Sequence, residues 1–265
     1  MESKFKKMAR VGYVAKGTVY AIVGVLTFKA AFNMGGQKAG KMQVLQFLDH
    51  QTFGNVLLVL MGLGLCCYAG WRFIQSLKNP EHLGSDSKGK GKRLAFFVSG
   101  VLYLGLAIMA FLRVFGSSGG SGGTTSPQRS SFLASETGLI FLGIAGALII
   151  CVGIYQFLKA YRSDYFKKFD LYSIQEEKRR KLIKNTAEVG LSARGVIFLI
   201  IGFFAIKAAL NSNPSQIKTT VEAFSFIQQS SYGPWLMGLV AAGLVAYAIY
   251  MFLKAKYRRF PGTSI

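Results

Sequence analysis

The stretch LIFLGIAGALIICVGIYQFL, from Leu139 to Leu158, contains no charged residue. A helix on the surface of a soluble protein carries a polar, charged face along its whole length. At a rise of about 1.5 Å per residue, a stretch of this length matches the bilayer core, which is about 30 Å thick. The stretch therefore predicts a helix that is surrounded by hydrocarbon rather than by water.

Comparable apolar runs occur elsewhere in the chain. Six runs are seen in all: Val11 to Phe32, Gly54 to Ile74, Leu94 to Phe115, Gly138 to Leu158, Gly190 to Leu210, and Pro234 to Leu253. Of the 265 residues, 51% are hydrophobic and only 16% are charged, against about 25% charged residues in ordinary soluble domains. These features predict an all-α polytopic membrane protein with six transmembrane helices.

The sequence contains an internal repeat. RVGYVAKGTVY, from Arg10 to Tyr20, resembles EVGLSARGVIF, from Glu188 to Phe198, and a weaker copy is VSGVLY, from Val98 to Tyr103. The second helices share the motifs WRFIQS at Trp71, YQFLKA at Tyr155 and YMFLKA at Tyr250. Repetition at consistent spacing indicates one structural unit used several times. We predict three two-helix repeats over 1–80, 81–165 and 166–265, the last of which includes a basic cytoplasmic segment.

The distribution of basic residues predicts the orientation in the membrane. Of 32 Lys and Arg residues, 25 lie on the side of the two termini and 7 on the other side. Cytoplasmic loops carry the excess of Lys and Arg in membrane proteins, so both termini are expected inside. Because two helices return the chain to its starting side, the units are parallel repeats related by an axis along the membrane normal. We expect the three units to close around a pseudo-threefold axis. The alternative is that they stand side by side in an open row.

Three segments outside the spans have a distinct character. Lys41 to Phe53 and Lys218 to Tyr232 place apolar residues at helical spacing, and we expect short amphipathic helices on the outer face. Gly116 to Ser126 is rich in Gly, Ser and Thr, which is typical of a flexible loop.

Basic residues near the helix ends are the candidate functional groups. Lys29, Arg113 and Lys207 occur near the outer end of the first helix of each unit. One interpretation is that their side chains extend to the interface with the charge in water. The other is a cationic ring at an outer vestibule, which would attract anions. At the inner face, Lys16, Arg194, Arg179 and Arg180 are expected to anchor to anionic lipid headgroups.

Aromatic residues gather at the inner ends of the second helices. They are Tyr68, Trp71, Tyr155, Phe157, Tyr247 and Tyr250. Such residues are typical of the belt at a membrane–water interface, and we expect that position rather than a base-stacking or cofactor role.

The first repeat motif resembles a known family. Ala9 to Tyr20 reads ARVGYVAKGTVY, which is similar to the pattern of domain of unknown function 1206, a two-helix module that recurs three times in bacterial membrane proteins. The middle unit departs from the pattern, with Ser99 in place of the basic residue. The resemblance implies a multi-pass protein of the bacterial cytoplasmic membrane. It does not indicate which activity the protein has.

No motif for catalysis, metal binding or a cofactor is present, so we expect no enzyme, metal or cofactor. The excess of Lys and Arg over Asp and Glu is explained by membrane topology, so we expect membrane lipids and no nucleic acid as partners. The leading functional hypothesis is a channel or transporter for a small solute or ion, including anions. The alternatives are a non-transporting scaffold or regulatory subunit that contacts headgroups or an acidic partner, and a lipid-handling enzyme.

Overall fold

The structure is a computed structural model that describes residues 2–84, 86–115, 135–162, 169, 176–212 and 216–258. Within these ranges the chain forms eight helices, and six of them are long and apolar enough to cross a membrane, as predicted. The long helices are α1 (Glu2–Ala31), α3 (Gly54–Leu77), α4 (Ser87–Phe115), α6 (Glu136–Tyr161), α7 (Glu177–Leu210) and α9 (Gly233–Tyr257). The predicted loop Gly116 to Ser126 lies outside the described residues.

Two of the long helices begin well before the apolar runs that revealed them. α1 starts at Glu2 and α7 at Glu177, although the apolar runs start only at Val11 and Gly190. Lys, Arg and Glu are good helix formers, so these polar segments extend the helices without adding a hydropathy signal. As a result, Lys16 and Arg194 stand near the middle of their helices.

The two short helices are present at the predicted positions, as α2 (Lys41–Asp49) and α8 (Thr220–Gln228). The expected place of α2 on the outer face needs correction. The N–H group of Ala39, just before α2, donates a 3.1 Å hydrogen bond to Oγ1 of Thr27, which lies inside the α1 span. A Cβ atom on Gly40 would lie 3.5 Å from Thr220 at the start of α8. α2 therefore begins inside the protein, whereas α8 begins next to it with its N-cap residue Thr219 exposed.

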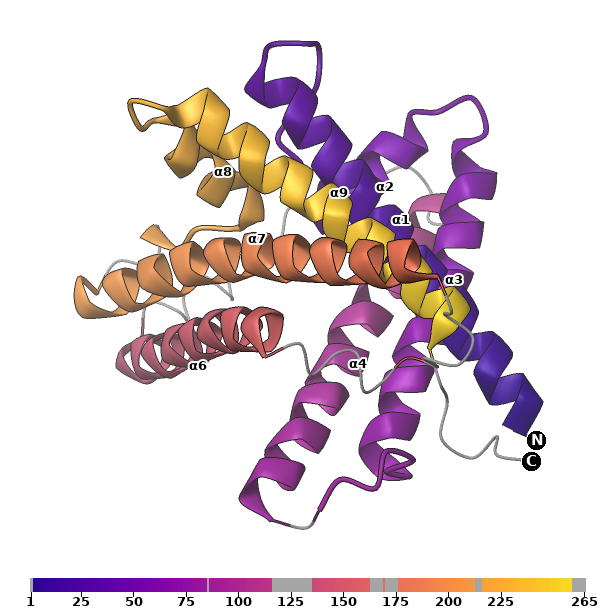
Figure 1. Cartoon of the computed structure of the whole chain (residues 1–265). Coiled ribbons are helices and arrows are strands. Elements are labelled where there is room, and N and C mark those ends of the chain that lie inside the picture. Colours follow the sequence, from indigo (N-terminus) through magenta and orange to yellow (C-terminus); the bar gives the residue numbers. More distant parts are fainter. Residues whose placement is uncertain are drawn as a thin grey trace.

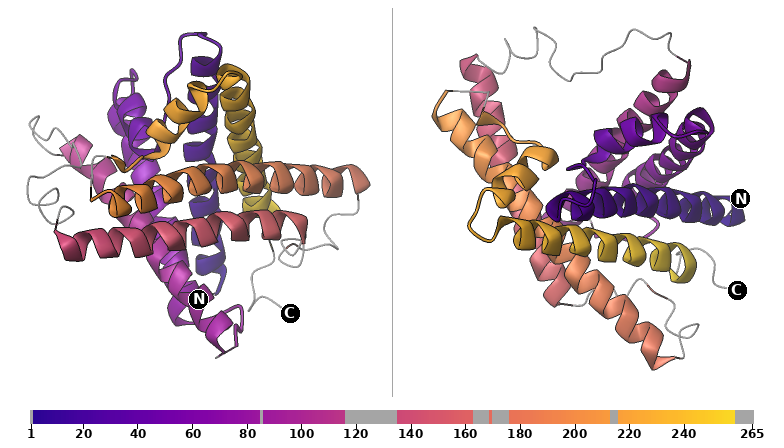
Figure 2. Two further views of the ribbon diagram at one scale, coloured as in Figure 1. Left: turned by 90° about the vertical axis from the view of Figure 1, so that its left-hand side faces the viewer. Right: turned by 90° about the horizontal axis from the view of Figure 1, so that it is seen from above.

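The long helices pack as three pairs, each made of helices from two different repeats. The most extensive contacts join α1 with α9, α3 with α4, and α6 with α7. Figures 1 and 2 show these pairs crossing one another at steep angles. α1 also packs against α3, and α7 against α9, but α4 and α6 form no comparable interface and lie on separate arms in Figure 2. The ring of repeats is therefore packed at the first and third units and loose at the second.

One contact recurs in all three pairs and confirms the repeat at the level of packing. A Cβ atom on Gly17 would lie 2.7 Å from the ring of Phe252, one on Gly100 2.8 Å from Phe73, and one on Gly195 2.5 Å from Phe157. In each case the glycine belongs to the first helix of one unit and the phenylalanine to the second helix of the preceding unit, counted cyclically. Small residues let helix backbones approach closely in membranes. The three repeats are therefore related by cyclic pseudo-threefold contacts.

The aromatic residues at the second helices do not form the expected interfacial belt. Tyr68, Trp71, Tyr247 and Tyr250 are each at most 3% exposed, whereas Tyr155 of the second unit is 51% exposed. In the first and third units these rings fill the interior where the helix pairs cross. Their hydroxyl groups need partners there, since a buried polar group without one costs free energy.

Candidate functional site

Lys16 of α1 lies at the centre of the molecule and is only 4% exposed. Its ammonium group donates a 2.8 Å hydrogen bond to the hydroxyl of Tyr68. It also lies 4.6 Å from the centre of the Tyr68 ring and 4.9 Å from that of Tyr103. Aromatic faces attract cations, and the attraction is stronger where water is excluded. Two tyrosines from α3 and α4 thus hold the charge of Lys16 inside the protein.

Arg194 of α7 repeats this arrangement in the third unit. Its Nη1 atom donates a 2.6 Å hydrogen bond to the hydroxyl of Tyr247 in α9. The guanidinium carbon lies 4.5 Å from the centre of the Tyr247 ring and 5.1 Å from that of Phe198. Lys16 and Arg194 occupy equivalent positions in the repeat motif, and so do Tyr68 and Tyr247. The second unit has Ser99 at the basic position and makes no such pair.

Arg72 adds a third positive charge and links the centre to the end of α9. Its Nε and Nη2 atoms donate hydrogen bonds of 2.8 and 2.6 Å to the Tyr68 hydroxyl, and its Nη1 donates to Gln75. Gln75 in turn donates to Glu81, which forms an ion pair with Arg258. Burial lowers the pKa of the Arg258 guanidinium to about 10, so it stays charged at neutral pH.

The positive charges at the centre are not balanced by nearby acids. Lys16, Lys41, Arg72 and Arg194 form what we call the cationic cluster; the ammonium group of Lys41 lies 4.8 Å from the centre of the Tyr103 ring. Among the described residues, no carboxylate forms a hydrogen bond or ion pair with any of the four. Unpaired charges in a protein interior cost several kcal/mol. The arrangement is therefore favourable for an anionic ligand.

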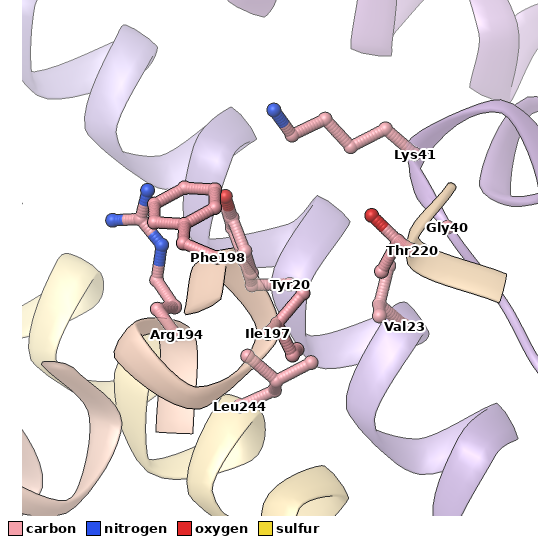
Figure 3. A pocket seen from close by; sticks show the side chains of 9 residues that line it. All are labelled: Tyr20, Val23, Gly40, Lys41, Arg194, Ile197, Phe198, Thr220 and Leu244. Atoms are coloured by element: carbon pink, nitrogen blue, oxygen red, sulfur yellow. The ribbon is translucent and has the colours of Figure 1, made fainter. Parts of the chain in front are cut away.

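A cavity of about 50 Å³ lies next to the cationic cluster. It is lined by residues from five helices and one loop: Tyr20, Val23, Gly40, Lys41, Arg194, Ile197, Phe198, Thr220 and Leu244. Figure 3 shows the guanidinium group of Arg194 beside the hydroxyl of Tyr20, with Lys41 and Thr220 on the other side. Since a single water needs about 10–15 Å³ of such volume, the cavity has room for a small ion.

The cavity also lies at the beginnings of α2 and α8. Gly40 and Lys41 begin α2, and Thr220 is the first residue of α8. The first backbone N–H groups of a helix have no partner within it, and the helix dipole adds about half a positive charge at that end. The N-terminus of α2 thus adds to the positive potential supplied by the side chains, whereas at α8 the Glu222 carboxylate accepts a 2.5 Å hydrogen bond from the N–H of Thr219 and offsets the potential of that helix end.

The three residues of the candidate outer ring, Lys29, Arg113 and Lys207, do not form one contact network in the described part of the chain. Lys29 and Lys207 are exposed, near the ends of α1 and α7. Arg113 in α4 instead forms a 3.1 Å ion pair with Asp49 of α2. Over the described part of the chain, no hydrogen bond, ion pair or ring contact joins any two of the three. Their role at an outer vestibule stays a prediction.

The candidate headgroup anchors divide into two groups. Lys16 and Arg194 point into the interior and contact tyrosines, which corrects their expected place among lipid headgroups. Arg179 and Arg180 lie exposed in the first turn of α7, and Arg179 pairs with Glu176 at 2.8 Å. Contact of these two arginines with headgroups remains a prediction.

Sequence reasoning missed most of the residues around the cavity. Lys41 was counted among outer basic residues, and Tyr20, Tyr68, Tyr103 and Tyr247 were not considered as partners of a charge. One signal was present: a tyrosine follows the position of Lys16 by four residues in the first unit and recurs as Tyr103 in the second. Residues four apart share a helix face, so the motif already placed a phenol beside a cation.

Comparisons with known proteins show what this chain is similar to. The family model described as Domain of Unknown Function (DUF1206) matches three times, over residues 11–79, 94–163 and 189–258. An uncharacterized protein, YxxB of Bacillus subtilis (strain 168), is 33% identical over 96% of this chain and 91% of its own length. No solved structure matches.

Proposed function

The chain belongs to the DUF1206 family, a family of unknown function, and from its cationic cluster we propose that it is a membrane channel or transporter for a small anion. The observation that carries the proposal is the cluster of Lys16, Lys41, Arg72 and Arg194 around tyrosines, which no carboxylate of the described residues contacts. Ionisable residues within membrane spans mark ion or substrate pathways, because placing them there is costly. An anion that binds here offsets that cost.

The position of the short helices beside the cavity supports the same proposal. In several transporters, broken or short helices point their N-termini at anionic groups of the substrate near the membrane midplane. Here α2 and α8 both begin at the cavity beside Arg194. Non-helical backbone at this depth is tolerated where it is buried in protein or lines a water-filled cavity, and the segment before Lys41 meets that condition through the Ala39–Thr27 hydrogen bond.

The cavity suits a small solute. Its volume of about 50 Å³ accommodates an inorganic ion or a very small organic acid. The ammonium group of Lys16 lies 6.0 Å from the centre of the Tyr20 ring, which lines the cavity, so we propose that these two side chains rotate as the ion passes. The proposal is therefore stepwise movement of a small anion rather than conduction through a wide pore.

We place the protein in the bacterial cytoplasmic membrane with both termini inside, as the excess of Lys and Arg favours. In this orientation the exposed Arg179 and Arg180 face the anionic leaflet. Lys29, Arg113 and Lys207 then lie toward the outer side, where they are candidates to attract the anion before it enters.

The test is anion flux into liposomes that contain the purified full-length protein. Lys16→Met and Arg194→Met remove one charge each from the cationic cluster, and each is expected to lower flux at least tenfold. Lys29→Met and Lys207→Met together remove exposed charges and report separately on the outer ring. Wild-type liposomes that pass anions no faster than protein-free liposomes would rule out the transport function.

A scaffold or regulatory subunit is the second candidate function, and α4 and α6 favour it. Only 28% and 22% of their apolar windows are buried, against 44–56% for the other four spans. A helix that buries so little within its own chain is free to pack against lipid or another membrane protein. Purification from the native membrane with a second protein in fixed stoichiometry, together with no anion flux, would favour this candidate.

A further inference from the structure

Building on the proposed anion function, we infer that the ligand of the central cavity is a small planar oxyanion, such as nitrate or formate, in preference to a halide. Arg194 is the residue that makes this distinction. The inference deepens the proposed function by naming the class of anion that the cavity takes.

The orientation of Arg194 is fixed by its neighbours. Its Nη1 atom donates to Tyr247, and its guanidinium carbon lies near the rings of Tyr247 and Phe198. Among the described residues, no acceptor bonds to the Nε atom, although this atom is buried. A buried N–H group without an acceptor is unusual in proteins and calls for an explanation. An absent anionic ligand provides one.

The free edge of the guanidinium group has the geometry for two oxygen atoms. Nε and Nη2 present parallel N–H donors, and such an edge matches the paired oxygens of a carboxylate or another planar oxyanion. A halide has a single centre and gains less from this fork. Nη1 is already occupied by Tyr247, and Arg194 lines the cavity, so we assign the Nε–Nη2 edge to the ligand, with a small turn of the guanidinium group to bring the buried Nε to it.

The opposite side of the cavity supplies donors for the rest of the anion. Figure 3 shows the Lys41 ammonium group and the Thr220 hydroxyl across the cavity from Arg194. The first turn of α2, which starts with Lys41, lies at the same wall. A lysine acts as a point charge and a hydroxyl as a single donor, so this side attracts any anion and leaves the distinction between anions to Arg194.

The experiment measures binding rather than transport, so that the two proposals can fail separately. The purified full-length protein in detergent is titrated with nitrate, formate, chloride or bromide at constant ionic strength, and the rise in melting temperature gives each affinity. We expect nitrate and formate to bind roughly tenfold more tightly than the halides, the difference expected for one extra charge-assisted hydrogen bond.

Arg194→Lys keeps the charge and removes the fork. It is expected to weaken nitrate and formate binding by about tenfold and to change halide binding by less than about twofold. Tyr247→Phe keeps Arg194 and releases its Nη1, so the preference for oxyanions should shrink in this variant as well. Tyr247→Phe carries the test if Arg194→Lys fails to fold.

Equal affinity of the wild type for halides and oxyanions overturns the inference and leaves a general anion site. Retention of the full preference in Arg194→Lys, or in Tyr247→Phe where Arg194→Lys does not fold, overturns it as well. Tight binding of an oxyanion without any flux in liposomes would instead uphold this site and reject transport. The absence of binding by all four anions rejects the inference and removes the support for an anion function.

Discussion

Gly12 of α1 lies so close to Tyr68 of α3 that a Cβ atom on the glycine would stand 2.5 Å from the Tyr68 Cα. Gly190 and Tyr247 have the same relationship in the third repeat, also at 2.5 Å. Both tyrosines accept hydrogen bonds from the cationic cluster. The glycines thus set the helix approach that brings the phenols to Lys16 and Arg194, and this packing links the fold to the candidate site.

Gly12→Ala is expected to destabilise the protein because its Cβ would collide with backbone atoms that cannot move aside. Overpacking of this kind typically costs about 1–3 kcal/mol. Gly105→Ala is the matched control, since a Cβ at that position meets nothing within 4 Å and alanine favours the helix over glycine by roughly 0.5–1 kcal/mol. The two melting temperatures in detergent should move in opposite directions, and a Gly12→Ala protein as stable as the wild type would contradict the packing.

Tyr68→Phe is expected to destabilise the protein more than Tyr103→Phe does. The Tyr68 hydroxyl accepts bonds from Lys16 and Arg72, so its removal leaves buried charged donors without their acceptor. Such a loss costs about 1–3 kcal/mol. The buried Tyr103 hydroxyl forms no hydrogen bond to a charged group among the described residues, and at most a weak one to the Tyr20 phenol, so its removal costs less. Equal melting temperatures for the two variants would contradict this assignment.

Lys16→Met is expected to raise the melting temperature or leave it unchanged. The substitution removes a buried charge that no carboxylate in the described part of the chain neutralises, and apolar replacements of buried charges are often neutral or stabilising. Tyr68 keeps its hydrogen bonds from Arg72 after the change. A fall of several degrees would mean that the ammonium group is needed for the fold, and the loss of flux in this variant would then carry no argument for a functional role.

The sequence predicted the spans, the repeat and the two short helices because each has a local pattern. Hydrophobic runs of membrane length are visible without any tertiary information. The equivalence of Gly17, Gly100 and Gly195 was readable from the motifs, and the packing against three phenylalanines confirmed it.

The site was not predictable in the same way, because it depends on helix length and rotation. Polar residues before Val11 hid the first turns of α1, so Lys16 was placed at a helix end rather than near its middle. The depth of Lys41 depends on how the chain returns from α1 through Ala39. No local pattern encodes that return, and the convergence of four cations therefore came only from the tertiary structure.

The ion pair between Arg113 and Asp49 should contribute little to stability. Their side chains are 24% and 33% exposed, and partly exposed pairs are typically worth less than about 1 kcal/mol. A double-mutant cycle with Arg113→Ala and Asp49→Ala measures the coupling through melting temperatures. We expect a small coupling because α2 is held mainly by its packing against α3. A coupling energy above about 2 kcal/mol would contradict this and show that the ion pair holds α2 against α4.

Reporter tags at the two ends of the chain are expected on the same side of the membrane. α1 and α9 pack along their lengths with opposite chain directions, since Gly24 meets Val245 while Gly238 meets Phe32. The end of α9 therefore lies beside the first half of α1, close to Tyr13, and the start of α1 and the end of α9 are on the same side of the molecule in Figure 1. The ion pair of Arg258 with Glu81 adds the connection between α3 and α4 to that side.

A phosphatase fusion, active only outside the cytoplasm, should be inactive at both termini and active after Asn211, between α7 and α8. Opposite results at the two termini would contradict the antiparallel α1–α9 pair, and activity at both would reverse the predicted orientation.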